Sequence, residues 1–151
     1  MKVKDIMTED VITVDSKTKI KEIASILTEN RIHGIPVMEK KKIIGIITET
    51  DLFVNGSENL YLPSLIDSIE RTDFTNKIPR DKKNKIKELT KAKAEDIMSH
   101  DCMTIAPEIG VEKLLDIFKE TKFHTMPVVD KNNLLCGIVT LADVIALIGE
   151  L

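Results

Sequence analysis

The sequence predicts an α/β fold in which two copies of one β-α-β-β-α unit pack together, with a mostly helical insert between them. The first observation is an internal repeat: Asp-Ile-Met-Thr at residues 5–8 recurs as Asp-Ile-Met-Ser at residues 96–99, displaced by 91 positions. The second is that helical and strand-like apolar patterns alternate in the same order within each copy. The third is length, because 151 residues suffice for one compact domain or for two very small ones that share a core.

Each copy begins with a short predicted strand, at residues 12–14 or 103–105, and continues with an amphipathic helix. The apolar residues of this helix fall at i, i+3, i+4 and i+7, which is the spacing of one buried helical face. They are Ile20, Ile23, Ala24 and Leu27 in the first copy and Val111, Leu114, Leu115 and Phe118 in the second. We therefore expect the same helix in both copies.

A β-hairpin and a second helix follow. A short apolar run entered through proline precedes a turn and a β-branched run, which is typical of two paired strands. These runs are 36–38 and 43–48 in the first copy, and 127–129 and 134–140 in the second. The displacement grows to 92 in the turn, which places one inserted residue near Asn132 or Asn133. The second helices are predicted to begin at Thr48 and Thr140, whose hydroxyls occupy the N-cap position.

The predicted organisation is residues 1–53 for the first copy, 54–93 for the insert and 94–151 for the second copy. A unit of about 50 residues cannot bury its sheet face alone, so the copies should pack sheet against sheet. The insert is longer than structureless loops usually run. One helix is expected around residues 62–69, and a second, mostly solvated one in residues 77–93, where eight Lys or Arg face two acidic residues.

Composition narrows the classes of function. The formal net charge of −3 offers no global field for nucleic acid or an anionic membrane. No apolar run approaches the roughly 20 residues that span a bilayer. Residues 1–5 carry no apolar signal-peptide core, and Cys102 with Cys136 form no disulfide pattern, so a cytoplasmic protein without membrane partners is expected.

Three repeated motifs resemble those of the CBS domain, which is usually found as tandem pairs. They are Asp-Ile-Met followed by Thr or Ser, the His-x-x-Pro-Val step, and Gly-Ile-x-Thr-x-x-Asp, and they occur in this order twice. The resemblance implies a Bateman module with pseudo-twofold symmetry and two clefts between the CBS repeats. Such clefts commonly take AMP, ADP, ATP or S-adenosylmethionine as a regulatory ligand, with no catalytic cofactor. It also implies a homodimer formed through helices, for which we expect Leu52, Phe53, Ile145 and Ile148 to be exposed.

The Thr-x-x-Asp step at the start of each second helix suits a nucleotide. Asp51 and Asp143 can each accept two hydrogen bonds from vicinal ribose hydroxyls. Thr48 and Thr140 lie where free backbone N–H groups favour phosphate. The alternative is that the threonines are ordinary helix caps and the aspartates ordinary first-turn carboxylates.

Further candidates follow from the resemblance. His33 and His124 occupy a position that can meet phosphate, although either imidazole could simply pack at a strand entrance. In similar modules that hold phosphate strongly, an arginine often follows this histidine. Here Gly34 and Thr125 follow instead, which argues against tight polyphosphate binding. Arg31 and Lys122 would compensate in part. The remaining candidates are the backbone at Gly34-Ile35 and Thr125-Met126 together with Thr13 and Thr104 for adenine, and, more weakly, Thr8 and Ser99.

Other classes of function are less favoured. The cysteines lack a paired catalytic signature and no Gly-rich phosphate loop precedes a helix, so no enzyme is predicted. His100, Cys102, His124 and Cys136 lack the four-ligand spacing of a structural zinc site. A partner- or nucleic-acid-binding adaptor acting through the basic residues 77–93 is the principal alternative. An aromatic content of only 3% argues against nucleic acid as the partner. Any regulated protein would be a separate, unidentified partner.

Overall fold

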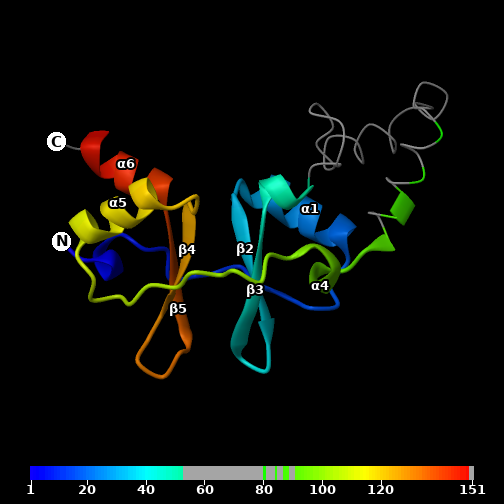
Figure 1. Cartoon of the computed structure of the whole chain (residues 1–151), viewed down its shortest axis with the longest axis horizontal. Helices are drawn as coiled ribbons and strands as arrows, with labels where there is room; N and C mark the ends of the chain where they lie inside the picture. The colour runs from blue at the N-terminus through cyan, green and yellow to red at the C-terminus, as the bar shows by residue number, and fades with distance from the viewer. Residues whose placement is uncertain (53–79, 81–83, 85–86, 89–90, 150–151) are drawn as a thin grey trace.

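The computed structural model contains two small sheets that stand side by side in the middle of the molecule (Figure 1). It describes residues 1–52, 80, 84, 87–88 and 91–149. The first sheet has the order β1-β2-β3, with β1 (Val14–Asp15) parallel to β2 (Gly34–Glu39) and β2 antiparallel to β3 (Lys42–Thr48). The second is the antiparallel pair of β4 (Thr125–Val129) and β5 (Leu135–Thr140). Both predicted hairpins are therefore present.

The two hairpins differ at their turns, as the inserted residue requires. Lys40 and Lys41 both have positive φ, 48° and 65°, as in a two-residue type I′ turn. The second turn is one residue longer, and Asn133 closes it with φ of 62°. The Asp130 carboxylate holds this loop by accepting the amides of Asn132 at 2.8 Å and Leu134 at 3.0 Å. The insertion predicted near Asn132 or Asn133 is thus confirmed.

The predicted amphipathic helices are α1 (Ile20–Asn30) and α5 (Val111–Glu120). All four predicted face residues of α1 are buried, and in α5 Leu114 and Phe118 are buried while Val111 and Leu115 pack partly exposed against the same core. Figure 1 shows α5 beside the β4–β5 hairpin and α1 beside the β2–β3 hairpin. Each copy therefore has its own core of helix packed on sheet.

The first strand of each copy is shorter than predicted. In the first copy, pairing is limited to Val14 and Asp15, so the strand begins two residues later and ends one residue later than the predicted 12–14. In the second copy Ile105 alone forms the equivalent parallel bridge, to Val128. The two positions nevertheless correspond across the repeat.

The start of each copy packs on the other copy, which the sequence did not predict. The leader segments, residues 2–8 and 93–99, contain the 3-10 helix η1 (Val3–Asp5) and the short helix α4 (Ala94–Ile97). Val3 is fully buried in the core of the second copy, and Ala94 is fully buried in the core of the first. Figure 1 shows the N-terminus beside α5 and α4 on the side of α1. Each copy is therefore completed by the leader of its partner copy.

The second helices begin where predicted but differ in form. In the second copy α6 (Leu141–Gly149) directly follows Thr140. In the first copy the segment after Thr48 is the 3-10 helix η2 (Glu49–Leu52). Leu52 is fully buried, so its predicted exposure was wrong: its side chain fills the core of the first copy. Ile145 and Ile148 are exposed, as expected.

Most of the insert, including the predicted helix around residues 62–69 and Phe53 before it, lies outside the described residues. Within the basic region the described residues Arg80, Asn84, Lys87, Glu88 and Lys91 have helical backbone. In the described part of the chain, no helix is long and apolar enough to cross a membrane.

Candidate functional site

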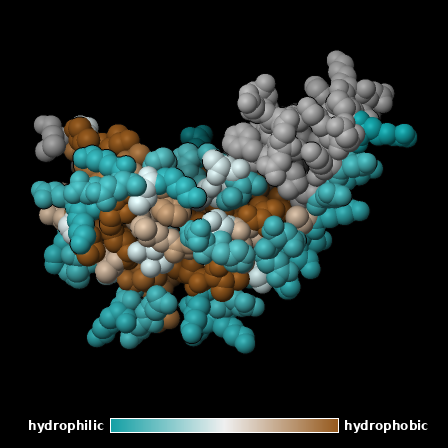
Figure 2. All heavy atoms as spheres, in the orientation of Figure 1, coloured by the Kyte–Doolittle hydropathy of each residue, from teal (hydrophilic) through white to brown (hydrophobic). Residues whose placement is uncertain are grey.

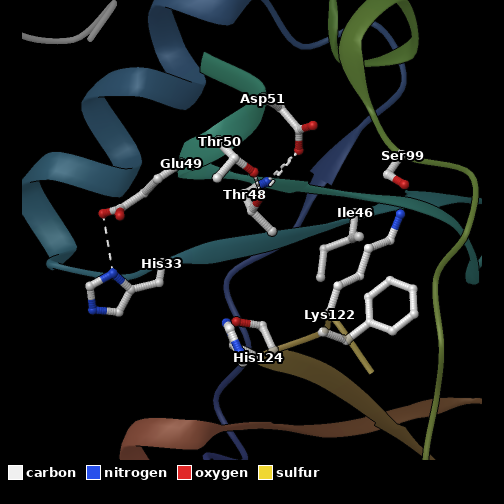
Figure 3. Close-up of a pocket in the computed structure, with 11 residues that line it drawn as sticks. His33, Ile46, Thr48, Glu49, Thr50, Asp51, Ser99, Lys122 and His124 are labelled. Carbon is white, nitrogen blue, oxygen red and sulfur yellow. Dashed lines mark hydrogen bonds and ion pairs between the residues drawn. The ribbon is translucent and has the colours of Figure 1, made fainter. Parts of the chain in front are cut away.

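Two clefts lie between the copies, and each is lined by side chains from both. The first cleft, of about 490 Å³, is drawn in Figure 3. The first copy contributes His33, Ile46, Thr48, Glu49, Thr50 and Asp51; the second contributes Ser99, Lys122, Phe123, His124 and Thr125. The volume lies within the range of small-molecule sites.

The second cleft, of about 390 Å³, is the counterpart of the first under the internal repeat. The first copy contributes Thr8, Asp10, Val11, Ile12, Asn30, Arg31, Ile32, His33 and Gly34; the second contributes Thr125, Ile138, Thr140, Ala142 and Asp143. Each cleft therefore joins the Thr-x-x-Asp step of one copy to the histidine segment of the other. The internal repeat alone does not show whether the Thr-x-x-Asp step of a copy meets the histidine segment of the same copy or of the other.

The exchanged leaders build part of each cleft. Ser99 and Ile46 exchange backbone hydrogen bonds of 3.0 and 2.9 Å, and Thr8 and Ile138 exchange two of 2.9 Å. These antiparallel bridges bring Ser99 and Thr8 against the strands that carry Thr48 and Thr140. Thr8 and Ser99, which are among the candidate ligand-binding residues predicted from the sequence, each line a cleft.

The glycine that opens the third motif makes this approach possible. A Cβ at Gly45 would lie 2.7 Å from Met98 Sδ and 2.9 Å from the Ser99 carbonyl oxygen. A Cβ at Gly137 would collide in the same way with Met7 Sδ. Real Cβ atoms are not found as close to a backbone oxygen as 2.9 Å, so the approach of Ser99 requires glycine at position 45. At Gly137 the clash is with the flexible Met7 side chain, and the Thr8 carbonyl oxygen would lie 3.2 Å away.

The aspartates and threonines of the two clefts hydrogen-bond to each other. Asp51 Oδ2 accepts the Thr48 amide at 2.8 Å and its hydroxyl at 3.3 Å. Asp143 Oδ2 accepts the corresponding groups of Thr140 at 2.7 and 2.8 Å, and Thr140 Oγ1 accepts the Asp143 amide at 3.3 Å. The helix-cap interpretation thus has support. It uses only Oδ2, and the Oδ1 atoms form no hydrogen bond with a described residue.

The two histidines differ in their contacts. His33 lines both clefts, and its Nδ1 lies 3.1 Å from Glu49 Oε1. His124 lines the first cleft, and its carbonyl oxygen accepts the Leu141 amide at 2.9 Å. Figure 3 shows His33 and His124 on the side of the cleft opposite Asp51. Each histidine is thus available to a ligand that also contacts the aspartate of the other copy.

One wall is common to both clefts. Thr125 and His33 line the two of them, and a Cβ at Gly34 would lie 3.1 Å from Thr125 Cγ2. Gly34 and Thr125 are equivalent in the repeat, so they meet near the pseudo-twofold axis. Their small side chains let the two histidine segments lie close together.

Four candidates do not line either cleft. The side chains of Ile35 and Met126 are fully buried in the two cores, and Thr13 and Thr104 are exposed outside the lining. Sequence reasoning missed several lining residues. Ile46 and Ile138 could have been found, because they are identical and lie two residues before the motif threonines. Glu49 corresponds to Leu141 in the repeat and gave no repeat signal.

The cysteines provide no reactive thiol in either cleft. Burial raises the pKa of Cys102 to about 11, and burial also raises the pKa of Cys136. Thiols with raised pKa values are poor nucleophiles and poor metal ligands at neutral pH. Among the described residues no three His, Cys, Asp or Glu side chains come together as a possible metal site.

Comparison with known proteins places these features in a family. The CBS domain model matches residues 3–56 and 94–150. An uncharacterized protein of Methanocaldococcus jannaschii is 30% identical over 151 residues, covering 96% of this chain and 89% of its own. The chain spans 58% and 22% of the lengths of two other curated relatives, which are therefore longer proteins.

Solved structures agree with this assignment. The CBS domain pair of protein MJ0100, in complex with 5′-methylthioadenosine and S-adenosyl-L-methionine, superposes with a TM-score of 0.70 at 25% identity, covering 99% of this chain and 97% of that one. The CBS domain of a CBS domain-containing membrane protein from Sphaerobacter thermophilus gives a TM-score of 0.73 at 28% identity, covering 97% and 87%.

Proposed function

Because this chain belongs to the CBS domain family and carries two copies of the domain, we propose that it is a regulatory module whose two clefts bind an adenine nucleotide or another adenosyl ligand such as S-adenosylmethionine. The observation that carries the proposal is the pairing in each cleft of an aspartate from one copy with a histidine and a cation from the other. No catalytic step is part of it. The unpaired cysteines accord with the cytoplasmic location included in the proposal.

The clefts offer complementary groups to each part of such a ligand. The Oδ1 atoms of Asp51 and Asp143 are available to ribose hydroxyls, with which carboxylates form charge-assisted hydrogen bonds. Ile46 with Phe123 in the first cleft, and Ile32 with Ile138 in the second, supply apolar surface for adenine. Lys122 and Arg31 supply one fixed positive charge to each cleft.

A ligand in either cleft would act on the packing of the two copies, because it would contact both. Such a ligand shifts the equilibrium between arrangements of the copies only as far as its affinities for them differ. A separate protein that contacts the module would then sense the ligand through that shift. The MJ0100 complex supports an adenosyl ligand, since a CBS domain pair of the same fold holds two adenosyl compounds.

Isothermal titration of AMP, ADP, ATP, S-adenosylmethionine and NAD into the purified protein tests the proposal. We expect micromolar binding of at least one compound, and at least a 30-fold loss of affinity in the double variant Asp51→Ala, Asp143→Ala. Both substitutions also remove a cap interaction, which is worth about 1 kcal/mol each, so circular dichroism must show that the variant is folded.

The variant Asp116→Ala provides the matched control, because Asp116 is an exposed carboxylate on α5 that lines neither cleft. It should bind like the wild type. Absence of binding by every compound to the folded wild-type protein would refute the proposal and would favour the adaptor function of residues 77–93.

A further inference from the structure

The two clefts differ in the segments that supply their carboxylates, although most of their lining residues correspond. Threonine, aspartate, isoleucine and histidine recur at equivalent places, and Lys122 in the first cleft corresponds to Arg31 in the second. The residue after the motif threonine differs: it is Glu49 in the first copy and Leu141 in the second. Glu49 lines the first cleft, whereas Leu141 packs partly buried against the core of the second copy.

Glu49 and Asp51 line the same cleft, and both belong to the segment that follows Thr48. Glu49 is two residues from Asp51, and Figure 3 shows its side chain reaching along the cleft to His33, with Lys122 at the opposite end. A neutral His33 that donates from Nδ1 leaves the negative charge of Glu49 in place. Lys122 does not neutralise it either, since its Nζ lies 5.9 Å from the centroid of the Phe123 ring and forms no ion pair with Glu49 among the described residues.

The second cleft also contains an additional carboxylate, Asp10, but at a different place. Asp10 comes from the segment that follows Thr8 of the first leader, and not from the Thr-x-x-Asp step of the second copy. Each lining has one fixed cation and two carboxylates, and only in the first cleft do both carboxylates lie within two residues of each other.

We propose that Glu49 makes the first cleft selective for adenosyl ligands with a neutral or cationic 5′ substituent, such as a thioether or a sulfonium, and against a 5′-phosphate. The second cleft, without a carboxylate at that place, accepts a phosphate. The inference rests on the proposed function, because it takes Asp51 and Asp143 as the ribose contacts. The 5′ carbon of ribose is bonded to C4′, next to the diol carbon C3′, so a ribose bound to Asp51 would hold its 5′ substituent in the cleft that Glu49 lines.

Single-cleft variants allow the two sites to be compared within one protein. Asp143→Ala leaves the first cleft intact and Asp51→Ala leaves the second, and each is titrated with AMP and with 5′-methylthioadenosine at one pH and ionic strength. The ratio of the two dissociation constants is the readout, since it cancels effects on folding common to both ligands. We expect the ratio of the AMP dissociation constant to that of 5′-methylthioadenosine to be about 10-fold higher in the first cleft than in the second. This is the size of effect expected from one half-exposed like charge near the phosphate.

Adding Glu49→Gln to the Asp143→Ala variant should remove this 10-fold difference, because the amide keeps the shape of the side chain without its charge. Glu112→Gln, on α5 and outside both linings, is the matched control and should leave the ratio unchanged. Raising the salt concentration should narrow the difference between the clefts, since exposed charges are screened.

Three results separate the possible failures. Equal ratios in the two clefts, or a ratio that Glu49→Gln does not change, would overturn the selectivity and leave the adenosyl sensor standing. No binding of either compound to the wild-type protein would overturn the sensor itself. If an aspartate variant still binds ligand in both clefts, NMR titration measures the dissociation constants of the two clefts separately. His124 lines only the first cleft and Arg31 only the second, so their chemical shifts report one cleft each.

Discussion

At the scale of single residues, the motifs of this chain are explained by contacts between the copies. The methionine of each Asp-Ile-Met segment lies against the glycine of the other copy's third motif, and the threonine and aspartate of that motif hydrogen-bond to each other. A motif therefore contains residues that face a cleft and residues that only allow the copies to meet. Glycine belongs to the second kind.

Replacing Gly45 by alanine should destabilise the protein. The new Cβ would meet the Ser99 carbonyl oxygen as well as the flexible Met98 side chain, and the backbone cannot move aside without breaking the Ile46–Ser99 bridge. We expect the free energy of unfolding to fall by about 2 kcal/mol, within the range for overpacked cores. Urea denaturation followed by circular dichroism measures it.

Gly110→Ala is the matched control for this prediction, because nothing lies within 4 Å of a Cβ at Gly110 and its φ of −69° suits any residue. Its unfolding midpoint should stay close to that of the wild type. A Gly45→Ala protein as stable as Gly110→Ala would show that the leader can shift, against the close contact described above.

At the scale of elements, the leaders bind the partner copy through backbone hydrogen bonds and surface ion pairs. In the first leader, the Val3 amide donates to the Ile109 carbonyl at 2.8 Å, and Lys2 and Lys4 both pair with Glu108. In the second, Lys17 pairs with Glu95 at 2.6 Å. Both attachments join segments that are far apart in sequence.

Acid should weaken the attachment of the first leader. Hydrogen bonds from Lys2 and Lys4 lower the pKa of Glu108 to about 2, below its usual value in an unfolded chain. A carboxyl with a depressed folded-state pKa stabilises the fold above its unfolded pKa, and this contribution is lost as the pH falls from about 4.5 through about 2. The unfolding free energy of Glu108→Gln should therefore depend less on pH in this window than that of the wild type.

Chemical denaturation at closely spaced pH values provides the comparison, with Glu120→Gln, at the end of α5, as the control. If the wild type and Glu108→Gln lose stability in parallel below pH 4.5, the ion pairs do not hold the leader in solution. The effect should be small, because both lysines and Glu108 are about half exposed.

The elements also show what could be predicted from the sequence. The face of α1, both hairpins and the start of α6 were predicted from apolar spacing and turn residues, because these patterns are local. The leader exchange was not, because both copies carry the same leader and the same docking strand, and a repeat does not reveal which leader meets which strand. Leu52 was placed wrongly on the expected dimer surface: its counterpart Val144, on the α-helix α6, is also buried, so this position faces the core in both copies.

Within the clefts, the candidates that could be predicted were those with a counterpart in the other copy, such as Thr48 with Thr140. Ile35 and Met126 also have counterparts, but alternation along β2 and β4 turns their side chains into the cores. Glu49 lines the first cleft without such agreement, since Leu141 stands at its place in the second copy. Asp10 has an identical counterpart, Asp101, but only Asp10 lines a cleft.

At the scale of the whole molecule, we propose that the chain forms the homodimer that the family resemblance implies, through an exposed apolar surface. Ile145 and Ile148 lie one helical turn apart on α6 and are 57% and 66% exposed. Figure 2 shows hydrophilic residues over much of one face of the molecule, and apolar residues gathered over α6. Contact between two such helices would remove these side chains from water.

The double variant Ile145→Ser, Ile148→Ser should dissociate that dimer. Light scattering after size-exclusion chromatography should give twice the chain mass for the wild type and the mass of one chain for the variant at micromolar concentration. Leu134→Ser is the control, since Leu134 is 44% exposed in a hairpin turn away from α6, and it should remain dimeric. A wild type that elutes as a monomer would contradict the proposal.

The exchanged leaders bear on how a fold of this kind can arise by gene duplication. A gene for one copy would encode a core that lacks its closing segment and a segment that lacks its core. Two such products could satisfy each other as a domain-swapped pair, whose folding would depend on their concentration. Fusing the two genes makes the exchange intramolecular, at an effective concentration on the order of millimolar. After fusion the two halves no longer need to be identical, so that one could gain a glutamate where the other keeps a leucine.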